Sequence, residues 1–182
     1  MFRSNEVLQP NTEQHEYLFI DTSQYDNIGN NVYFENETKM KFRTKFNETI
    51  HVSTGKVADS LTPGVVFKNI KSIELCGVSF NKHFLENAAF NQLDYIIIDI
   101  QELNGRIYSN SQHVNGVFAL LYLEDGKAYH KGRDFFDKIK TFKPPLSSLS
   151  SFNVCILTPE NEIVSVPENA SMTMMFKITS II

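Results

Sequence analysis

The stretch Asp94–Glu124, DYIIIDIQELNGRIYSNSQHVNGVFALLYLE, decides the fold class of this chain. Its two apolar ends predict β-strands at Tyr95–Gln101 and Val117–Leu123, because both are rich in the β-branched and aromatic residues that strands favour. The polar segment between them contains Asn104-Gly105 and Asn115-Gly116, and Asn-Gly is a strong turn signal because both residues accept positive φ. The stretch therefore predicts two strands of a β fold, and it carries no pattern that points to chemistry.

The first of these strands has two different faces. Its even-numbered positions from 96 to 100 are all isoleucine, whereas the odd-numbered face changes from Ile97 to Asp99 and Gln101. Successive side chains of a strand point to opposite faces of the sheet. We therefore expect the face with the even-numbered residues to lie in the core. The face with the odd-numbered residues should be mostly exposed to water at its far end, at Asp99 and Gln101.

The length and composition of the chain fit one globular β domain. It has 182 residues, of which 42% are apolar and 21% charged, so a core can form without a metal or disulfide staple. The formal net charge of −4 argues against the broad basic footprint of a nucleic-acid-binding protein. Fifteen Phe and seven Tyr, with no Trp, predict an aromatic-rich core or interface.

Several features predict a soluble protein made in a reducing compartment. Cys76 and Cys155 both lie in apolar strand patterns, where we expect two buried thiols rather than a disulfide. The first residues do not resemble a signal peptide, and no apolar run approaches the roughly 18 residues of a transmembrane segment. In such a compartment the three glycosylation sequons are expected to be chance matches, at Asn36, Asn47 and Asn169.

The chain divides into an arm and one domain. Residues 1–15 are polar and aperiodic, which predicts an extended or flexible, disordered arm, and residues 16–182 form a single domain. Apolar patterns in that domain predict eight to ten strands, the others being at Glu16–Ile20, Val32–Phe34, Met40–Phe46, Thr49–Ser53, Val65–Phe80 (one bent strand or two), Lys127–Lys131, Phe152–Thr158, Glu162–Val166 and Met172–Ile182.

Little of the chain predicts helix. Asn81–Leu93 is the best candidate, although a loop fits it nearly as well because the segment is short. Pro144-Pro145 is expected to end regular structure, and Leu146–Ser151 to be a polar link. Many strands without a βαβ rhythm predict an all-β fold, namely a single jelly-roll β-sandwich of about eight antiparallel strands.

No catalytic, cofactor-binding or metal-binding residues are predicted. The sequence has none of the glycine-rich phosphate loops, paired CxxC motifs or HExxH motifs that carry such chemistry, and its five histidines lie far apart. Asp99 and Glu102 are a conceivable acid pair for glycoside hydrolysis. A solvated strand end explains them better, because no second acidic segment accompanies them.

Two surface patterns each have a structural and a functional interpretation. A basic ladder follows one face of a predicted strand, with Lys39, Lys41, Arg43 and Lys45. It fits the wet face of an edge strand, where lysines discourage unwanted pairing, better than a site for an acidic partner. The Met- and Phe-rich end is expected to be core, although Met and Phe would suit a protein interface if exposed, at Met172, Met174, Met175 and Phe176.

Five segments occur in an order that resembles a viral protein family: YLFIDTSQYDN from Tyr17, VVFKNIKSIELCGVSF from Val65, YIIIDIQELNGRIYSN from Tyr95, VFALLYL from Val117, and PLSSLSSFNVCILTPENEIV with a later FKITSI. The chain resembles the jelly-roll penton and minor capsid proteins of the nucleocytoplasmic large DNA viruses from about Tyr17 to its end. YIIIDIQELNG is the most specific segment. The family's early Ile-Asp-Ser followed by Arg and Asp is present only as Ile20–Ser23, without the Arg.

The resemblance implies a structural capsid protein rather than an enzyme. Such a protein would form a homopentamer at the capsid vertices or, alternatively, would be a minor protein bridging or underlying the major-capsid capsomers. Its partners would be further copies of itself, the major capsid protein and other minor capsid proteins, with no specific nucleic acid and no cofactor. It would be made in the host cytoplasm and reside in the virion.

Two further classes of function remain open at the level of the sequence. One is a β-sandwich module that binds a glycan or a receptor, and the absence of Trp counts mildly against it. The other is an enzyme on a jelly-roll scaffold, which the missing histidine ligand pattern disfavours.

Overall fold

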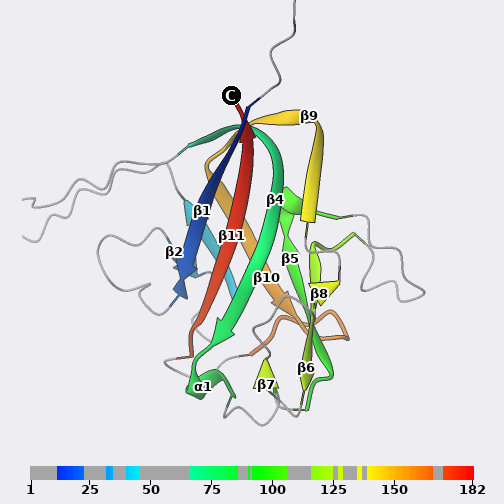
Figure 1. The fold of residues 1–182 in the computed structure, drawn as a ribbon. Helices are drawn as coiled ribbons and strands as arrows, with labels where there is room; N and C mark the ends of the chain where they lie inside the picture. Colours follow the sequence, from blue (N-terminus) through cyan, green and yellow to red (C-terminus); the bar gives the residue numbers. More distant parts are fainter. Residues whose placement is uncertain are drawn as a thin grey trace, which may run out of the picture.

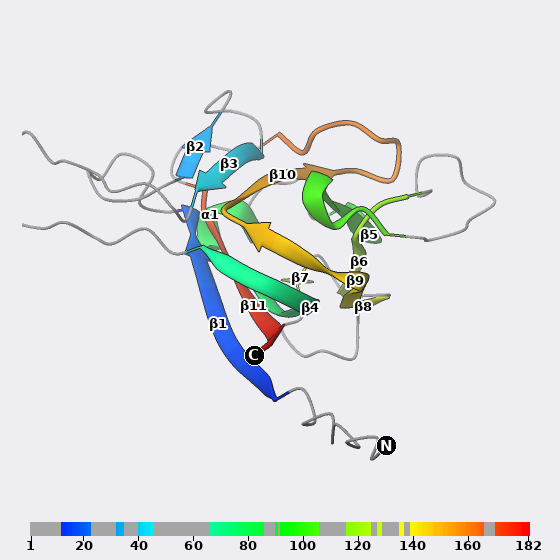
Figure 2. The ribbon, with the colours of Figure 1, turned by 90° about the horizontal axis from the view of Figure 1, so that it is seen from above.

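The computed structural model describes residues 12–22, 32–34, 40–45, 66–85, 90, 92–105, 116–124, 127–128, 135–136, 139–165 and 170–182. Within these residues the protein is nearly all β, and two antiparallel sheets pack together as a sandwich (Figure 1). Seen from above, β1, β11 and β4 lie in one layer and β2, β3 and β10 in the other (Figure 2). The predicted all-β sandwich is confirmed.

Four strands form the first sheet. In spatial order they are β1 (Glu13–Asp21), β11 (Met172–Ile181), β4 (Phe67–Phe80) and β9 (Ile139–Leu149). The second sheet contains, in order, β2 (Val32–Phe34), β3 (Lys41–Lys45), β10 (Ser151–Leu157), β5 (Tyr95–Ile100), β6 (Ala119–Glu124) and β7 (Lys127–Ala128), with β8 (Phe135–Phe136) also paired to β6. β1 and β9 are therefore the two edges of the first sheet.

The eight longer strands pair as in a jelly roll. Taken in chain order without the short β2, β7 and β8, the first pairs with the eighth, as β1 with β11, and the second with the seventh, as β3 with β10. The third pairs with the sixth, as β4 with β9, and the fourth with the fifth, as β5 with β6. These are the pairs of one long hairpin rolled into two sheets.

The core lies between the sheets and is rich in aromatic side chains. The predicted inward face of β11 is buried, with Met172, Met174, Phe176 and Ile178. The Phe176 ring lies 5.1 Å from the ring of Phe152 in β10 and 6.5 Å from that of Phe118, measured between centroids. These tilted ring contacts join the two sheets, because Phe176 belongs to one and Phe152 to the other.

Ile97 is buried on the outer face of β5, whose far end is predicted to be wet. It forms a small apolar cluster with Val117, Leu120 and Leu157, separate from the main core. Ile163 packs against this cluster and pairs with Leu157 through an isolated β-bridge. The chain after β10 thus turns back and pairs beside the end of β10, so that Ile163 packs on the outer cluster with Ile97 and Val164 packs in the main core.

Phe67–Phe80 is one long strand with two bulges. Its register with β11 steps over Lys71 and again over Cys76. The second bulge adjoins Gly77, as a glycine inside a strand predicts. A close backbone approach is not its cause, because no atom lies within 4 Å of the position that a Cβ on Gly77 would take. The bulge shifts the alternation, so that Val78, rather than Gly77, faces the core.

The prediction that Pro144-Pro145 ends regular structure is wrong, because both prolines lie inside β9. β9 is an edge strand, where the missing N–H of proline need not remove a ladder bond. The ladder between β9 and β4 skips Phe142–Pro145, so these four residues bulge from the sheet. The predicted link Leu146–Ser151 instead continues β9 to Leu149, and β10 begins at Ser151.

Other boundaries also differ from the predictions. β1 begins at Glu13, so Glu13–His15 belong to the domain rather than to the arm, because they pair with the last residues of β11. Gln101 does not extend β5 but opens a 3₁₀ turn, η2 (Gln101–Leu103). Of the predicted helix, the described part contains a single turn, α1 (Lys82–Leu85), and a buried Phe90.

Some predicted features lie outside the described residues. They are most of the arm, the strand Thr49–Ser53, the later part of Lys127–Lys131 and the three sequons. Glu162–Val166, predicted as a strand, contains two bridge residues in its described part, Ile163 and Ser165, and Val164 between them donates a backbone hydrogen bond to Ile156.

Cys76 and Cys155 form no disulfide, as predicted, and they lie in opposite sheets. Both are half-buried rather than buried, because Cys76 sits at a bulge of β4 and Cys155 on the outer face of β10. Within the described residues, no helix is long and apolar enough to cross a membrane.

Candidate functional site

Glu102 of the considered acid pair is held by the neighbouring strand. Its two carboxylate oxygens accept hydrogen bonds from the backbone N–H of Asn153, at 2.8 Å, and from the side-chain amide of the same residue, at 2.5 Å. Glu102 lies in η2 and Asn153 in β10, so the carboxylate ties the end of β5 to β10. Its observed contacts are those of a structural group.

Asp99 lies opposite Cys155 on the outer face of the second sheet and is half-buried. Burial raises the pKa of the Asp99 carboxyl above its usual range, and the nearby Glu102 carboxylate raises it further. With its amide oriented to donate, Asn104 reaches Asp99 Oδ1 at 2.8 Å and the carbonyl oxygen of Ile100 at 3.2 Å. Asp99 and Glu102 are therefore both held by hydrogen bonds at the end of β5.

A cleft of about 410 Å³ lies beside these hydrogen bonds, between the end of η2 and β9. It is lined by Leu103, Gly105, Phe118, Ile139, Lys140, Thr141 and Lys143. Lys140 Nζ donates a hydrogen bond to the carbonyl oxygen of Asn104. The lining contains two lysines and no carboxylate, so neither member of the acid pair faces this cleft.

The basic ladder is not on an edge strand. β3, which carries Lys41 and Arg43, lies between β2 and β10, so β2 is the edge at this end of the sheet. Lys41 and Arg43 pair with Cys155 and Asn153 on β10, next to the strand that carries Asp99. The prediction that these lysines protect an edge is therefore wrong, and Lys39 lies outside the described residues.

The histidines make no cluster in the part of the chain that the structure describes. His15 Nδ1 lies 3.2 Å from Thr179 Oγ1 on the neighbouring strand, and His83 is exposed in α1. The remaining three histidines lie outside the described residues. Among described side chains, no three His, Cys, Asp or Glu residues are placed to hold a metal ion.

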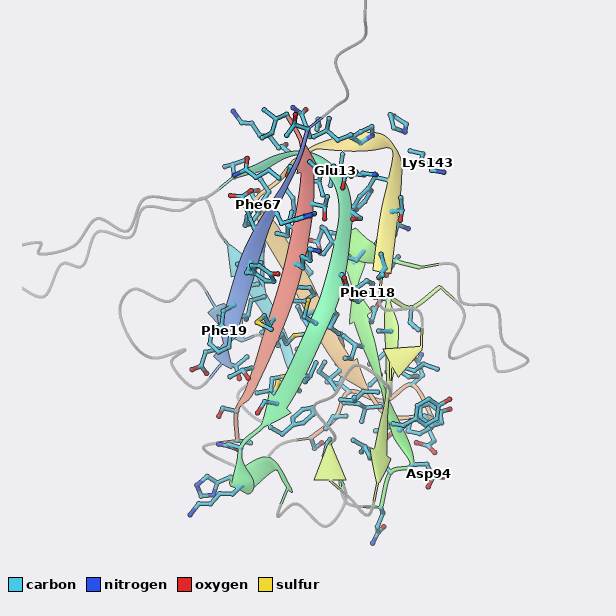
Figure 3. All side chains as sticks on the ribbon, in the orientation of Figure 1. Glu13, Phe19, Phe67, Asp94, Phe118 and Lys143 are labelled. Carbon is cyan, nitrogen blue, oxygen red and sulfur yellow. The ribbon has the colours of Figure 1, made fainter. Side chains whose placement is uncertain are left out.

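The most distinctive surface is apolar and lies on the outer face of β1 and β11. Tyr17 is 65% exposed and Phe19 is 62% exposed, and Met175, which pairs directly with Phe19, is also exposed. Figure 3 shows Phe19 beside β1, on the side of the molecule away from β9. A patch of large apolar side chains exposed to solvent is typical of an interaction surface.

Three edge strands, β1 and β9 of the first sheet and β2 of the second, differ in how they resist further pairing. β2 is only three residues long, and β9 carries two prolines and a bulge, which are both ways to discourage pairing. β1 has nine residues without Lys, Arg or Pro, and its register with β11 is unbroken. Within the described residues no strand covers the outer edge of β1, so this strand can accept a further one.

The sequence predicted the strand that carries this surface but not its exposure. In Tyr17–Ile20 every residue is apolar, so the run alone does not tell which face meets water. The pairing with β11 decides it, because Leu18 and Ile20 face the sheet that packs beneath and Tyr17 and Phe19 face outward.

Comparison with models of known protein families gives no match, and no curated protein sequence is significantly similar to this chain.

Proposed function

We propose that this protein is a structural subunit of the capsid of a large icosahedral DNA virus, and most specifically a penton protein that forms pentamers at the vertices. The observation that carries the proposal is the jelly-roll pairing of β1 with β11, β3 with β10, β4 with β9 and β5 with β6, which uses all eight longer strands. Jelly rolls are a frequent architecture of viral capsid proteins. The ordered sequence segments that resemble the penton and minor capsid proteins support the same assignment.

The surface chemistry fits a protein that binds other proteins. The outer edge of β1, which no described strand covers, and exposed aromatic side chains suit contacts with neighbouring subunits. Glu102 of the considered acid pair holds η2 to β10, and among the described residues no group of three His, Cys, Asp or Glu is placed to hold a metal ion. In this proposal the protein is not an enzyme, needs no cofactor, is made in the host cytoplasm and resides in the virion.

Because a jelly roll serves many functions, the proposal needs a test of assembly. Light scattering after size exclusion, at two protein concentrations, measures the mass of the particle against the 20.9 kDa chain. We expect a discrete species of five subunits. A monomer that also binds the major capsid protein in a pull-down would move the protein to a minor, bridging position in the capsid. A monomer that binds no capsid protein would overturn the proposal, and saturable sugar binding by it would identify a glycan-binding module instead.

A further inference from the structure

The two edges of the first sheet are oriented for head-to-tail addition. Neighbouring strands of this sheet are all antiparallel, so β1 and β9 run in opposite directions. A second copy related by rotation about an axis along the strands keeps its strand directions. Its β1 therefore approaches β9 of the first copy as an antiparallel neighbour, and the sheet continues from copy to copy.

The two edges also carry opposite charge. β1 contains Glu13, Glu16 and Asp21 and no Lys or Arg, whereas β9 contains Lys140 and Lys143 and no acidic residue. Glu13 already pairs with Lys71 of β4 on the outer face of the sheet. The carboxylate of Glu16 would be met by a lysine of a neighbouring β9.

The pairings across the sheet show which residues lie at the same height on its two edges. One row runs from Glu16 through Ile178 and Ile73 to Lys140. The next row runs from Tyr17 through Lys177 and Glu74 to Ile139. Rotation about an axis along the strands leaves heights unchanged, so residues of one row meet when two copies join edge to edge.

The meeting residues are complementary in both rows. Glu16 would oppose Lys140 on the face directed to the sandwich interior, because their row contains the buried Ile73 and Ile178. Tyr17 would oppose Ile139 on the outer face, and these side chains are 65% and 48% exposed in the single chain. An apolar pair and an opposite-charge pair on adjacent rows both favour antiparallel pairing.

We propose that the contact between subunits joins β9 of one copy to β1 of the next, with Lys140 against Glu16 and Ile139 against Tyr17. This inference rests on the proposed function, because it supplies the head-to-tail contact that a closed ring repeats at every step. Strand pairing at this contact is short, because β9 begins at Ile139 and its bulge at Phe142–Pro145 follows directly after Thr141. Lys140 keeps donors for Glu16 after its bond to the Asn104 carbonyl oxygen, because an ammonium group has three.

Charge reversal tests the polar row. Glu16→Lys and Lys140→Glu, each alone, place like charges in contact and should weaken the subunit contact about tenfold or more. The double variant Glu16→Lys/Lys140→Glu restores an opposite-charge pair and should recover the assembly. Glu160→Lys, an exposed reversal in the turn after β10, is the matched control and should leave the particle mass unchanged. Cooperative thermal unfolding of each variant shows that it is folded.

Cross-linking tests the register. Directly opposed residues of antiparallel strands have Cβ atoms about 4.5–5.5 Å apart, near the spacing a disulfide requires. A chain carrying both Tyr17→Cys and Ile139→Cys, with Cys76 and Cys155 changed to Ser, should give a ladder that ends at five chains on mild oxidation. Each single variant should give no ladder.

The outcomes separate this inference from the proposed function. A five-subunit particle that neither charge reversal nor cross-linking affects would overturn the edge contact and leave the capsid role standing. Cross-linked dimers from Tyr17→Cys alone would show pairing of two β1 strands and would also overturn it. A monomer that never cross-links and binds no capsid protein would overturn both.

Discussion

At the scale of single residues, the packing of Phe176 is the most sensitive point of the core. Its side chain is fully buried and contacts the rings of Phe152 and Phe118. Phe176→Ala removes these contacts and leaves a cavity, so the free energy of unfolding should fall by about 3–5 kcal/mol. Urea unfolding measures the change. Phe19→Ala, at an exposed position of the same residue type, should cost far less, and equal losses would contradict this account.

Asp99 should make the free energy of unfolding fall as the pH rises, whereas a carboxylate paired with a cation makes it rise. Its pKa is raised in the folded protein, so between the unfolded value near 3.8 and the higher folded value the native state binds more protons. Stability should therefore fall as the pH rises through this window, and Asp99→Asn should remove the fall. Urea unfolding from pH 3.5 to 7 checks this. A variant less stable than wild type at pH 7 would show that the carboxylate contributes a favourable contact.

At the scale of elements, the connection from β5 to β6 depends on Gly105. A Cβ at this position would lie 2.6 Å from the carbonyl oxygen of Val117, so backbone would have to move. Gly105→Ala should therefore destabilise the protein by about 1–3 kcal/mol. The matched control is Gly77→Ala, because that site has open space, and it should be neutral or stabilise by up to about 1 kcal/mol. Thermal unfolding of the two variants measures both.

Local patterns predicted most strands because alternation and β-branching act over a few residues. They failed where the position of a strand in the sheet decides the outcome. Prolines end a central strand, but β9 keeps its two prolines because it is an edge. The charges of Lys41, Arg43 and Lys45 favour an edge strand, but β2 pairs with Phe42–Thr44 and is itself the edge.

The candidate site was predictable only in part, for the same physical reason. The sequence placed Asp99 and Glu102 at the end of a strand, and the structure has them at the end of β5 and in η2. It did not predict that Asn153, about fifty residues later, binds Glu102. The exposure of Tyr17 and Phe19 likewise follows from the pairing of β1 with β11, which no local pattern contains.

At the scale of the whole molecule, β11 is the strand on which the first sheet depends. It lies between β1 and β4 and supplies the four-residue apolar face at the centre of the core. A chain that ends at Ala170 should therefore lose cooperative unfolding, as measured by circular dichroism during heating. A chain that ends at Ile181 loses one exposed side chain and one terminal backbone hydrogen bond, to Thr12, and should still unfold cooperatively. Retained cooperativity without β11 would mean that the second sheet folds by itself.

The position of β11 has a consequence for biosynthesis. β1 leaves the ribosome before its partner in the sheet, which follows only after about 150 further residues, from Asp21 to Met172. At a translation rate of about 5–20 residues per second, this interval lasts roughly 8–30 s. During that time the aromatic run of β1 has been made and its partner has not. The first sheet is therefore completed only when Met172–Ile181 leaves the ribosome, and the nascent chain must stay soluble until then.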